Sequence, residues 1–418
     1  MSNSNLKVSI FSTKESIGGA GIAAKRLFES LTGQEKNEIK MIVGYKISKD
    51  KNVIEINTFS KYLMKFYSRF ESYVLKSQKT ENKIHHSLGL TGVINSSYIN
   101  SLNSDIINLH WINSGFISIN TISKINKTVV LTIHDSWIFL GAEHHPNGEL
   151  DLRYISGYNK KNRDNNYSLI DLDRFIWSIK NKKLSSNINF IAPSLWIYNK
   201  LKNSLIFKNS NITHIPNALN TNIFKPLDKM ESRSKLNLDN ADKIILFGVF
   251  GDAFTINNKG IDLLIKSLEN LKNNNYLCLC VGHQSKSIEI GKLKIIFLGH
   301  ISENEKMAIA YNSSDVVVIP SRMENLTQMG TEALSCGKPV VAYDIGGNSD
   351  IIEDNSTGFL VEPFNTLEFS RKINKVLNLD FLKSAEMSFR CRQKALLNWS
   401  YPVVSEKYNN FFEKISKK

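Results

Sequence analysis

Cysteine is scarce in this chain and is not arranged for metal or redox chemistry. The four cysteines, Cys278, Cys280, Cys336 and Cys391, form no Cys-x-x-Cys pair. This excludes a disulfide framework and the common zinc and redox motifs, and it predicts reduced, structural thiols in the cytoplasm. No apolar run approaches the roughly 18 residues of a membrane-spanning helix. The first residues, MSNSNLKVSIFS, pass almost directly into an expected strand, so we expect no secretory signal.

Acidic residues are under-represented in one half of the chain only. Residues 1–216 hold 28 Lys and Arg against 16 Asp and Glu, whereas residues 217–418 hold 25 against 23. Such an asymmetry predicts an anionic partner for the first half. No helix-turn-helix, zinc-finger or RNA-binding signature accompanies it. We therefore favour an anionic membrane surface over nucleic acid; a merely basic, solvated surface is the alternative.

Short apolar strands alternate with helical runs twice along the chain. Examples are LKVSIFS and GIAAKRLFESL in the first half, and KIILFGVF and IDLLIKSLENL in the second. This alternation predicts two α/β domains with parallel, Rossmann-like sheets. We place them at residues 1–216 and 217–395, joined near Pro216 and Asn217. Residues 396–418 read as a final amphipathic helix.

Two glutamates define the most informative stretch, SRMENLTQMGTEALSCGKPVVAYDIGG. The strand DVVVIP leads into it, and a helical run then begins near Thr327. Glu324 lies in the loop before this helix, and Glu332 lies about two turns inside it. A helix start offers free N–H groups and a positive dipole end, which suit phosphate. Two carboxylates can bind hydroxyl groups on either side of the phosphate, so the pattern predicts a nucleotide-sugar site.

This stretch resembles the signature of the retaining glycosyltransferases of family 4, the glycosyl transferases group 1. The matching elements are Glu324, Glu332-Ala333, Cys336 to Val341 and Gly346-Gly347. The resemblance implies the GT-B fold, in which two Rossmann-like domains face a cleft and the C-terminal helix crosses back to the N-terminal domain. It also implies retention of anomeric configuration, no essential metal and no clear protein base.

The resemblance assigns donor-binding roles in the second half. Glu332 would contact the ribose and Glu324 the sugar. The backbone around Asn325, Leu326 and Thr327 would hold the phosphates.

Lys259 precedes an expected helix start, and the resemblance implies that it neutralises the leaving diphosphate; a solvated lysine is the alternative. The family commonly has an Arg a few residues earlier, but the loop GDAFTINNKG has none. Arg322, two residues before Glu324, is a candidate replacement.

A glycine-rich turn follows the first strand. Gly18 and Gly19 let the backbone approach a diphosphate, and the family has a similar donor-binding loop. Gly19, Gly21 and Ala24 also mimic the dinucleotide fingerprint. That fingerprint wants an acidic residue at the end of the next strand, where Lys46 stands instead, so NAD is not expected.

Two histidines are expected at the carboxyl ends of neighbouring strands, where ligands of parallel sheets gather. The resemblance places His134 close to the transferred sugar. We expect His110, and Asp135 beside His134, to contact the acceptor. A structural histidine is the alternative for His134, and Trp111 fits core and sugar platform equally.

Other polar pairs do not predict a metal site. Asp171 and Asp173 resemble a metal-binding Asp-x-Asp, but no strand precedes them and a helix surface fits better. The pairs His85-His86 and His144-His145 lack zinc-ligand spacing.

Residues 59–75, FSKYLMKFYSRFESYVL, combine aromatic and basic side chains at helical spacing. Phe59, Tyr62, Phe66 and others share one face, with Lys61, Lys65 and Arg69 on its flank. Such a helix fits a membrane interface or a core-facing position.

Together these features predict a retaining glycosyltransferase that moves a sugar from a nucleoside diphosphate sugar to a glycan or lipid-linked acceptor in surface polysaccharide synthesis. A nucleotide-sugar epimerase on the same fold and a non-catalytic nucleotide-sugar-binding protein remain as alternatives.

Overall fold

The computed structural model shows two compact units, Met1–Ala218 with Val404–Lys418, and Leu219–Val403. The structure describes residues 5–80, 82, 84–148, 150–163, 170–184, 188–238, 243–249, 257–271, 276–282, 288–290 and 293–417. Most of the predicted loop GDAFTINNKG lies outside these residues. No helix in the described part is long and apolar enough to cross a membrane.

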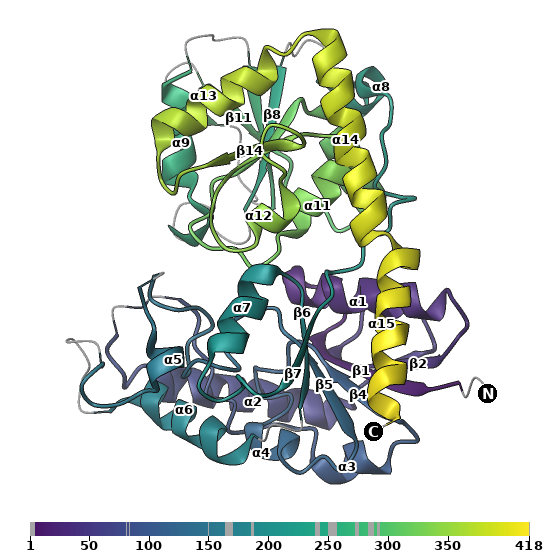
Figure 1. Ribbon diagram of the computed structural model, residues 1–418, viewed down its shortest axis with the longest axis vertical. Coiled ribbons are helices and arrows are strands. Elements are labelled where there is room, and N and C mark those ends of the chain that lie inside the picture. The colour runs from purple at the N-terminus through teal and green to yellow at the C-terminus, as the bar shows by residue number, and fades with distance from the viewer. Residues whose placement is uncertain are drawn as a thin grey trace. The chain divides into compact units, whose positions relative to one another are not determined.

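The first unit contains a fully parallel seven-stranded sheet with helices on both faces (Figure 1). Its order is β3-β2-β1-β4-β5-β6-β7. The strands are β1 (Lys7–Lys14), β2 (Glu38–Tyr45), β3 (Val53–Glu55), β4 (Ile106–Leu109), β5 (Thr128–Thr132), β6 (Asn189–Ala192) and β7 (Asn211–His214). The helices are α1 (Gly18–Thr32), α2 (Thr58–Leu75), α3 (Ser96–Ser101), α4 (Ile119–Ile122), α5 (Arg153–Ser156), α6 (Leu172–Lys183) and α7 (Leu195–Asn203).

The second unit contains a sheet of order β10-β11-β9-β8-β12-β13-β14, parallel except for the β10–β11 pair. The strands are β8 (Lys243–Gly248), β9 (Tyr276–Val281), β10 (Ile288–Ile290), β11 (Leu293–Phe297), β12 (Val316–Ile319), β13 (Val340–Tyr343) and β14 (Gly358–Val361). The helices are α8 (Lys229–Ser234), the 3-10 turn η1 (Asn257–Lys259), α9 (Ile261–Glu269), α10 (Asn304–Ser313), α11 (Gln328–Ser335), α12 (Asn348–Ile351), α13 (Thr366–Leu377) and α14 (Phe381–Trp399). The predicted fold class, two parallel-sheet α/β domains, is confirmed.

Each sheet has a point where the order of strands reverses. In the first unit this point lies between β1 and β4, and in the second between β8 and β12. The loops that leave the carboxyl ends of such a strand pair diverge and leave a crevice for ligands. The predicted site residues follow these strands or their neighbours.

The last helix, α15 (Tyr401–Ser416), runs from the second unit into the first. There Asn37 donates to Asn409 at 2.8 Å, and Lys36 pairs with Glu413 at 2.7 Å. The sequence predicted one helix from residue 396, but α14 continues to Trp399 and α15 starts only at Tyr401. Residues 396–403 stay with the second unit, where α14 packs on α11.

All four cysteines are free and buried in the second unit. Burial raises the pKa of each thiol, so none carries the thiolate needed for nucleophilic or metal chemistry.

Candidate functional site

Lys259 and Glu324 meet at the strand-order reversal of the second unit. Lys259 ends η1 after β8, and Glu324 lies in the loop after the neighbouring strand β12. The Lys259 ammonium donates to Glu324 Oε1 at 2.6 Å. The side chain of Lys259 is 34% exposed and that of Glu324 12%. The ammonium is therefore accessible, while the carboxylate holds its direction.

Two glycines let the loops around this pair touch backbone to backbone. Gly260 has a φ of +65°, and a Cβ there would lie 1.9 Å from the carbonyl oxygen of Pro320. Gly346 has a φ of +57°, and a Cβ there would lie 1.7 Å from the carbonyl oxygen of Glu324. Any larger residue would push these loops apart, so both glycines fix the position of the pair.

Helix α11 begins directly after this loop. Thr327 stands at its N-cap but makes no side-chain capping hydrogen bond. Asn325 and Leu326 are buried just before it. The start of α11 thus presents backbone N–H groups and the positive end of the helix dipole beside Lys259 and Glu324, which suits an anion.

Glu332 is buried on α11, with only 6% of its surface exposed. It is the fifth residue of the helix rather than two turns inside it, because the helix begins at Gln328. The hydroxyl of Tyr311, on α10, donates to Glu332 Oε2 at 2.7 Å. Tyr311 itself is completely buried, so it holds the Glu332 carboxylate from the interior of the unit. The sequence analysis missed Tyr311, because no spacing rule links it to Glu332.

Arg322 forms a two-pronged ion pair with Asp262, at 2.8 and 2.6 Å. Asp262 lies in the first turn of α9, and its hydrogen bonds with Arg322 lower its pKa. The guanidinium is thereby held near the start of α9, close in sequence to Lys259. Its proposed contact with a phosphate stays a prediction; the sequence analysis did not identify Asp262 as its partner.

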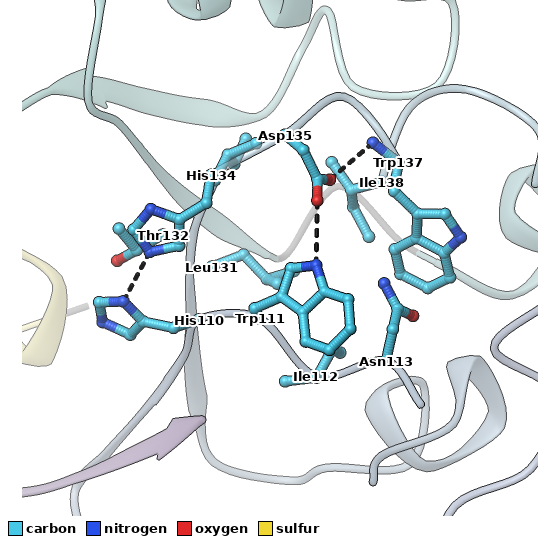
Figure 2. Close-up of a pocket in the computed structure, with 11 residues that line it drawn as sticks. His110, Trp111, Ile112, Asn113, Leu131, Thr132, His134, Asp135, Trp137 and Ile138 are labelled. Atoms are coloured by element: carbon cyan, nitrogen blue, oxygen red, sulfur yellow. Dashed lines mark hydrogen bonds between the residues drawn. The ribbon is translucent and has the colours of Figure 1, made fainter. Parts of the chain in front are cut away.

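In the first unit, His110 and His134 follow the neighbouring strands β4 and β5. Figure 2 shows their rings directed at each other, with His110 Nδ1 2.8 Å from His134 Nε2. Burial lowers the pKa of His134 to about 4, partly opposed by the charge of Asp135. Burial and His134 together lower the pKa of His110 well below its usual value. Both rings are therefore neutral at pH 7, and one donates its N–H to the other.

The Asp135 carboxylate contacts nitrogen atoms of three other residues. Its Oδ2 accepts from Trp111 Nε1 at 3.1 Å, and its Oδ1 accepts from the Trp137 backbone N–H at 3.0 Å (Figure 2). The same Oδ2 lies 2.6 Å from His144 Nδ1. Burial alone would raise the pKa of Asp135, but the charge and hydrogen bond of His144 hold it well below the usual range. The Asp135 carboxylate orients Trp111. A hydrogen bond from an acceptor to Asp135 would have to use oxygen lone pairs that these neighbours already occupy.

A small pocket of about 30 Å³ opens between the ends of β4 and β5 (Figure 2). Its polar lining includes His110, Trp111, Asn113, Thr132, His134 and Asp135. His110 Nε2 and Asn113 Oδ1 are buried and have no hydrogen-bond partner among the described residues. The volume suits a water molecule or one hydroxyl group rather than a whole sugar ring.

Gly18 and Gly19 open helix α1 after β1, next to the reversal point of the first sheet. Neither would meet any atom within 4 Å if it carried a Cβ, so the turn borders open space. Glu15, just before it, accepts the backbone N–H groups of Ile47 and Ser48 and pairs with Lys25 at 2.9 Å. Burial opposes ionisation of Glu15, but these hydrogen bonds lower its pKa to about 2, so it stays a charged anchor for the loop.

Asp171 and Asp173 both form hydrogen bonds that stabilise the fold around α6. Asp171 caps α6 by accepting the N–H of Arg174 at 2.9 Å. Asp173 is buried and accepts from Gln78 at 2.6 Å. Within the described residues no three His, Cys, Asp or Glu side chains are grouped closely enough to hold a metal ion.

Acid should destabilise the protein through the His110–His134 pair. A histidine whose pKa is lower folded than unfolded adds stability above about pH 6.5, and this stability is lost as pH falls towards 4. We expect the free energy of unfolding to fall by up to about 1.4 kcal/mol per pH unit for each such proton. Urea denaturation from pH 7 to 5 should show a shallower decline for His134→Gln than for the native chain. His300→Gln, in an exposed loop, is the control; equal slopes in all three proteins would contradict the assignment.

The comparisons with known proteins find glycosyltransferases. Residues 228–395 match the family model "Glycosyl transferases group 1". The poly(ribitol-phosphate) alpha-N-acetylglucosaminyltransferase of Staphylococcus aureus (strain COL) is 27% identical over 313 residues, which are 64% of this chain and 62% of that protein. The matched regions span 40 to 62% of the length of the first curated relatives.

Solved structures extend the likeness to the whole fold. Sucrose-phosphate synthase from Thermosynechococcus elongatus superposes with a TM-score of 0.69 at 18% identity, covering 98% of both chains. HepE of Anabaena, solved in complex with UDP-glucose, superposes with a TM-score of 0.65 at 14% identity, covering 98% of this chain and all of that one. The fold is that of the GT-B glycosyltransferases. The residues that match the group 1 family model all lie in the second unit.

Proposed function

We propose that the protein is a glycosyltransferase that transfers a sugar, hexosyl or related, from a nucleoside diphosphate sugar to an acceptor hydroxyl, with retention of configuration. The observation that carries this is the cluster at the β8–β12 reversal: the Lys259–Glu324 pair, the uncapped start of α11, and the buried Glu332 held by Tyr311. This cluster combines a cation and N–H groups, which suit phosphate, with two carboxylates, which suit hydroxyl groups.

In the proposed reaction the second unit binds the donor. Glu332 accepts from the ribose hydroxyls, while Lys259, the backbone of Asn325 to Thr327 and Arg322 bind the diphosphate. Glu324 orients the sugar. As the bond from the anomeric carbon to the phosphate oxygen breaks, the leaving nucleoside diphosphate takes the electron pair, and the Lys259 ammonium stabilises the growing charge.

The acceptor hydroxyl then bonds to the anomeric carbon on the same face of the sugar. Its proton passes to the leaving phosphate oxygen, so the protein needs no general base. His134, neutral at pH 7, acts as a hydrogen-bonding group for the sugar, and Gly18-Gly19 admits the diphosphate. His110 and Asn113 bind an acceptor hydroxyl in the small pocket.

A test is to incubate the protein with single nucleotide sugars and no acceptor. One donor should be hydrolysed slowly, with release of the nucleoside diphosphate, because water replaces the acceptor. Binding without any hydrolysis or transfer would favour the non-catalytic alternative.

Metal removal should leave the activity intact. Lys259 and the α11 dipole supply the positive charge that a divalent cation supplies elsewhere, so we expect full hydrolysis or transfer in excess EDTA. Loss of activity in EDTA that manganese restores would contradict this prediction and would favour a metal site at Asp171 and Asp173.

We further propose a glycan or lipid-linked acceptor and a role in surface polysaccharide synthesis, such as O-antigen, lipopolysaccharide, capsule or exopolysaccharide. The name of the Staphylococcus aureus relative specifies a polymeric acceptor, poly(ribitol-phosphate), which supports a polymer here. The excess of 12 positive charges in residues 1–216 (28 minus 16) supports attraction to an anionic membrane surface. We propose that this surface is the cytoplasmic face of the membrane.

A further inference from the structure

Helix α2 exposes a continuous aromatic stripe. Only Met64 and Glu71 of its 18 residues are buried. The stripe consists of Phe59, Tyr62, Phe66, Phe70 and Tyr73, which are 54 to 76% exposed. Their spacing of three and four residues puts them on one side of the helix. The core-facing interpretation of these rings is therefore wrong, since the hydrophobic side chains that the sequence grouped on one face mostly point into solvent.

The opposite side of α2 is fixed tightly to the first unit. A Cβ on Gly44 would lie 3.0 Å from the Met64 methyl group, and one on Gly115 would lie 2.9 Å from Tyr67 Cβ. Glu71 accepts the backbone N–H groups of Leu88 and Gly89. The helix is thus anchored on its buried side, so the aromatic stripe stays outside.

Basic side chains alternate with these rings along the helix. Lys65, Arg69 and Lys76 are exposed, and Lys65 Nζ lies 6.0 Å from the centre of the Tyr62 ring. Lys61 pairs with Glu55 at the edge of the helix. Glu71, the one acidic residue between Thr58 and Leu75, is buried against backbone N–H groups.

We propose that this face of α2 docks the protein on an anionic lipid bilayer. Phosphate headgroups complement Lys65, Arg69 and Lys76, and the aromatic rings fit the boundary between headgroups and acyl chains. Symmetric pairing with a second copy would instead bring cations against cations. Docking stands independently of donor chemistry; only its use in reaching a lipid-linked acceptor rests on the proposed function.

Vesicle co-sedimentation of the full chain tests the docking. The protein should bind vesicles of phosphatidylglycerol and phosphatidylcholine far more strongly than phosphatidylcholine alone, and more weakly at high salt. Lys65→Glu/Arg69→Glu should lower the partition coefficient by at least about tenfold. The matched pair Lys407→Glu/Lys414→Glu makes the same charge change on exposed positions of α15 and should cost much less.

The apolar part needs its own comparison. Phe66→Ser/Phe70→Ser removes two rings of the stripe and should lower binding at least about tenfold. Phe381→Ser/Phe389→Ser removes two exposed rings of α14 and should leave binding unchanged. Thermal melting confirms that each variant is folded, and Lys65→Gln/Arg69→Gln serves where the reversals destabilise α2.

Equal binding to neutral and anionic vesicles, or unchanged binding of both α2 variants, would overturn the proposal. Vesicle binding lost equally in the α15 control would assign the attraction to net charge and overturn it too. A dimer that the α2 variants dissociate, without vesicle binding, would identify a second copy as the occupant. Vesicle binding in a protein that binds no nucleotide sugar would refute the proposed function and leave the docking intact.

Discussion

Replacing Lys259 with alanine is expected to lower the rate of transfer about 10²- to 10³-fold, the usual effect of removing one donor that stabilises developing negative charge. The Lys259 side chain is 34% exposed and its ammonium lies 2.6 Å from Glu324, so it can reach a diphosphate without leaving its carboxylate. The loss should appear in kcat, because the charge on the leaving oxygen grows only as the sugar bond breaks. Steady-state rates at saturating donor measure it.

Lys266→Ala provides the matched control, because Lys266 is exposed on α9, seven residues further along the chain. It should leave kcat unchanged. Glu324→Ala should abolish transfer, since it removes the sugar contact and frees the ammonium. Near-normal turnover in either Lys259→Ala or Glu324→Ala would refute the site.

Replacing Glu332 with alanine is expected to abolish transfer at ordinary donor concentrations, chiefly by weakening donor binding. A contact to the ribose is equally strong before and during the reaction, so its loss raises KM more than it lowers kcat. A hydrogen bond to a charged group contributes roughly 1.5–3 kcal/mol, which predicts a rise in the donor Kd of about 10- to 100-fold. Calorimetric titration with the donor measures the change.

Tyr311→Phe distinguishes positioning from folding. Tyr311 touches Glu332 from inside the unit, so its loss should raise the donor Kd less than Glu332→Ala does, with kcat unchanged. Glu332→Gln keeps the shape and one acceptor oxygen, so it should fall between the two. A normal donor Kd in a folded Glu332→Ala protein would contradict the ribose assignment.

The sequence predicted well the strands and the helix that carry the proposed donor site, because the signals for these elements are local. The apolar runs DVVVIP and PVVAYD indicated the strands β12 and β13, and the helical run that contains Glu332 indicated α11. Strand order then follows from the general rules of parallel sheets, which gather these ends at one edge.

The side-chain partners could not be predicted in the same way. Tyr311 and Glu332 are 21 residues apart, and Asp262 and Arg322 are 60 apart. No periodicity relates such positions, because packing between elements brings them together. The same holds for His144, which reaches Asp135 through the fold of a loop rather than through a motif.

Helix α2 shows a different limit. Its periodicity indicated an apolar face, but amphipathic pattern does not say whether that face meets the core or the outside. Burial decided it: Met64 and Glu71 occupy the inner side, and the aromatic stripe lies outside.

A thermal-shift screen of nucleoside diphosphate sugars in EDTA tests the central claim most directly. A ligand at 100 times its Kd stabilises the folded state by about 2.7 kcal/mol, which corresponds to a rise in Tm on the order of 5–10 °C for a unit of this size. We expect one donor to give such a rise with the native protein and about half of it or less with Glu332→Ala, because a Kd about 10- to 100-fold weaker leaves about 0.4–1.4 kcal/mol at the same donor concentration. No rise with any nucleotide sugar, or the same rise in Glu332→Ala, would contradict the account.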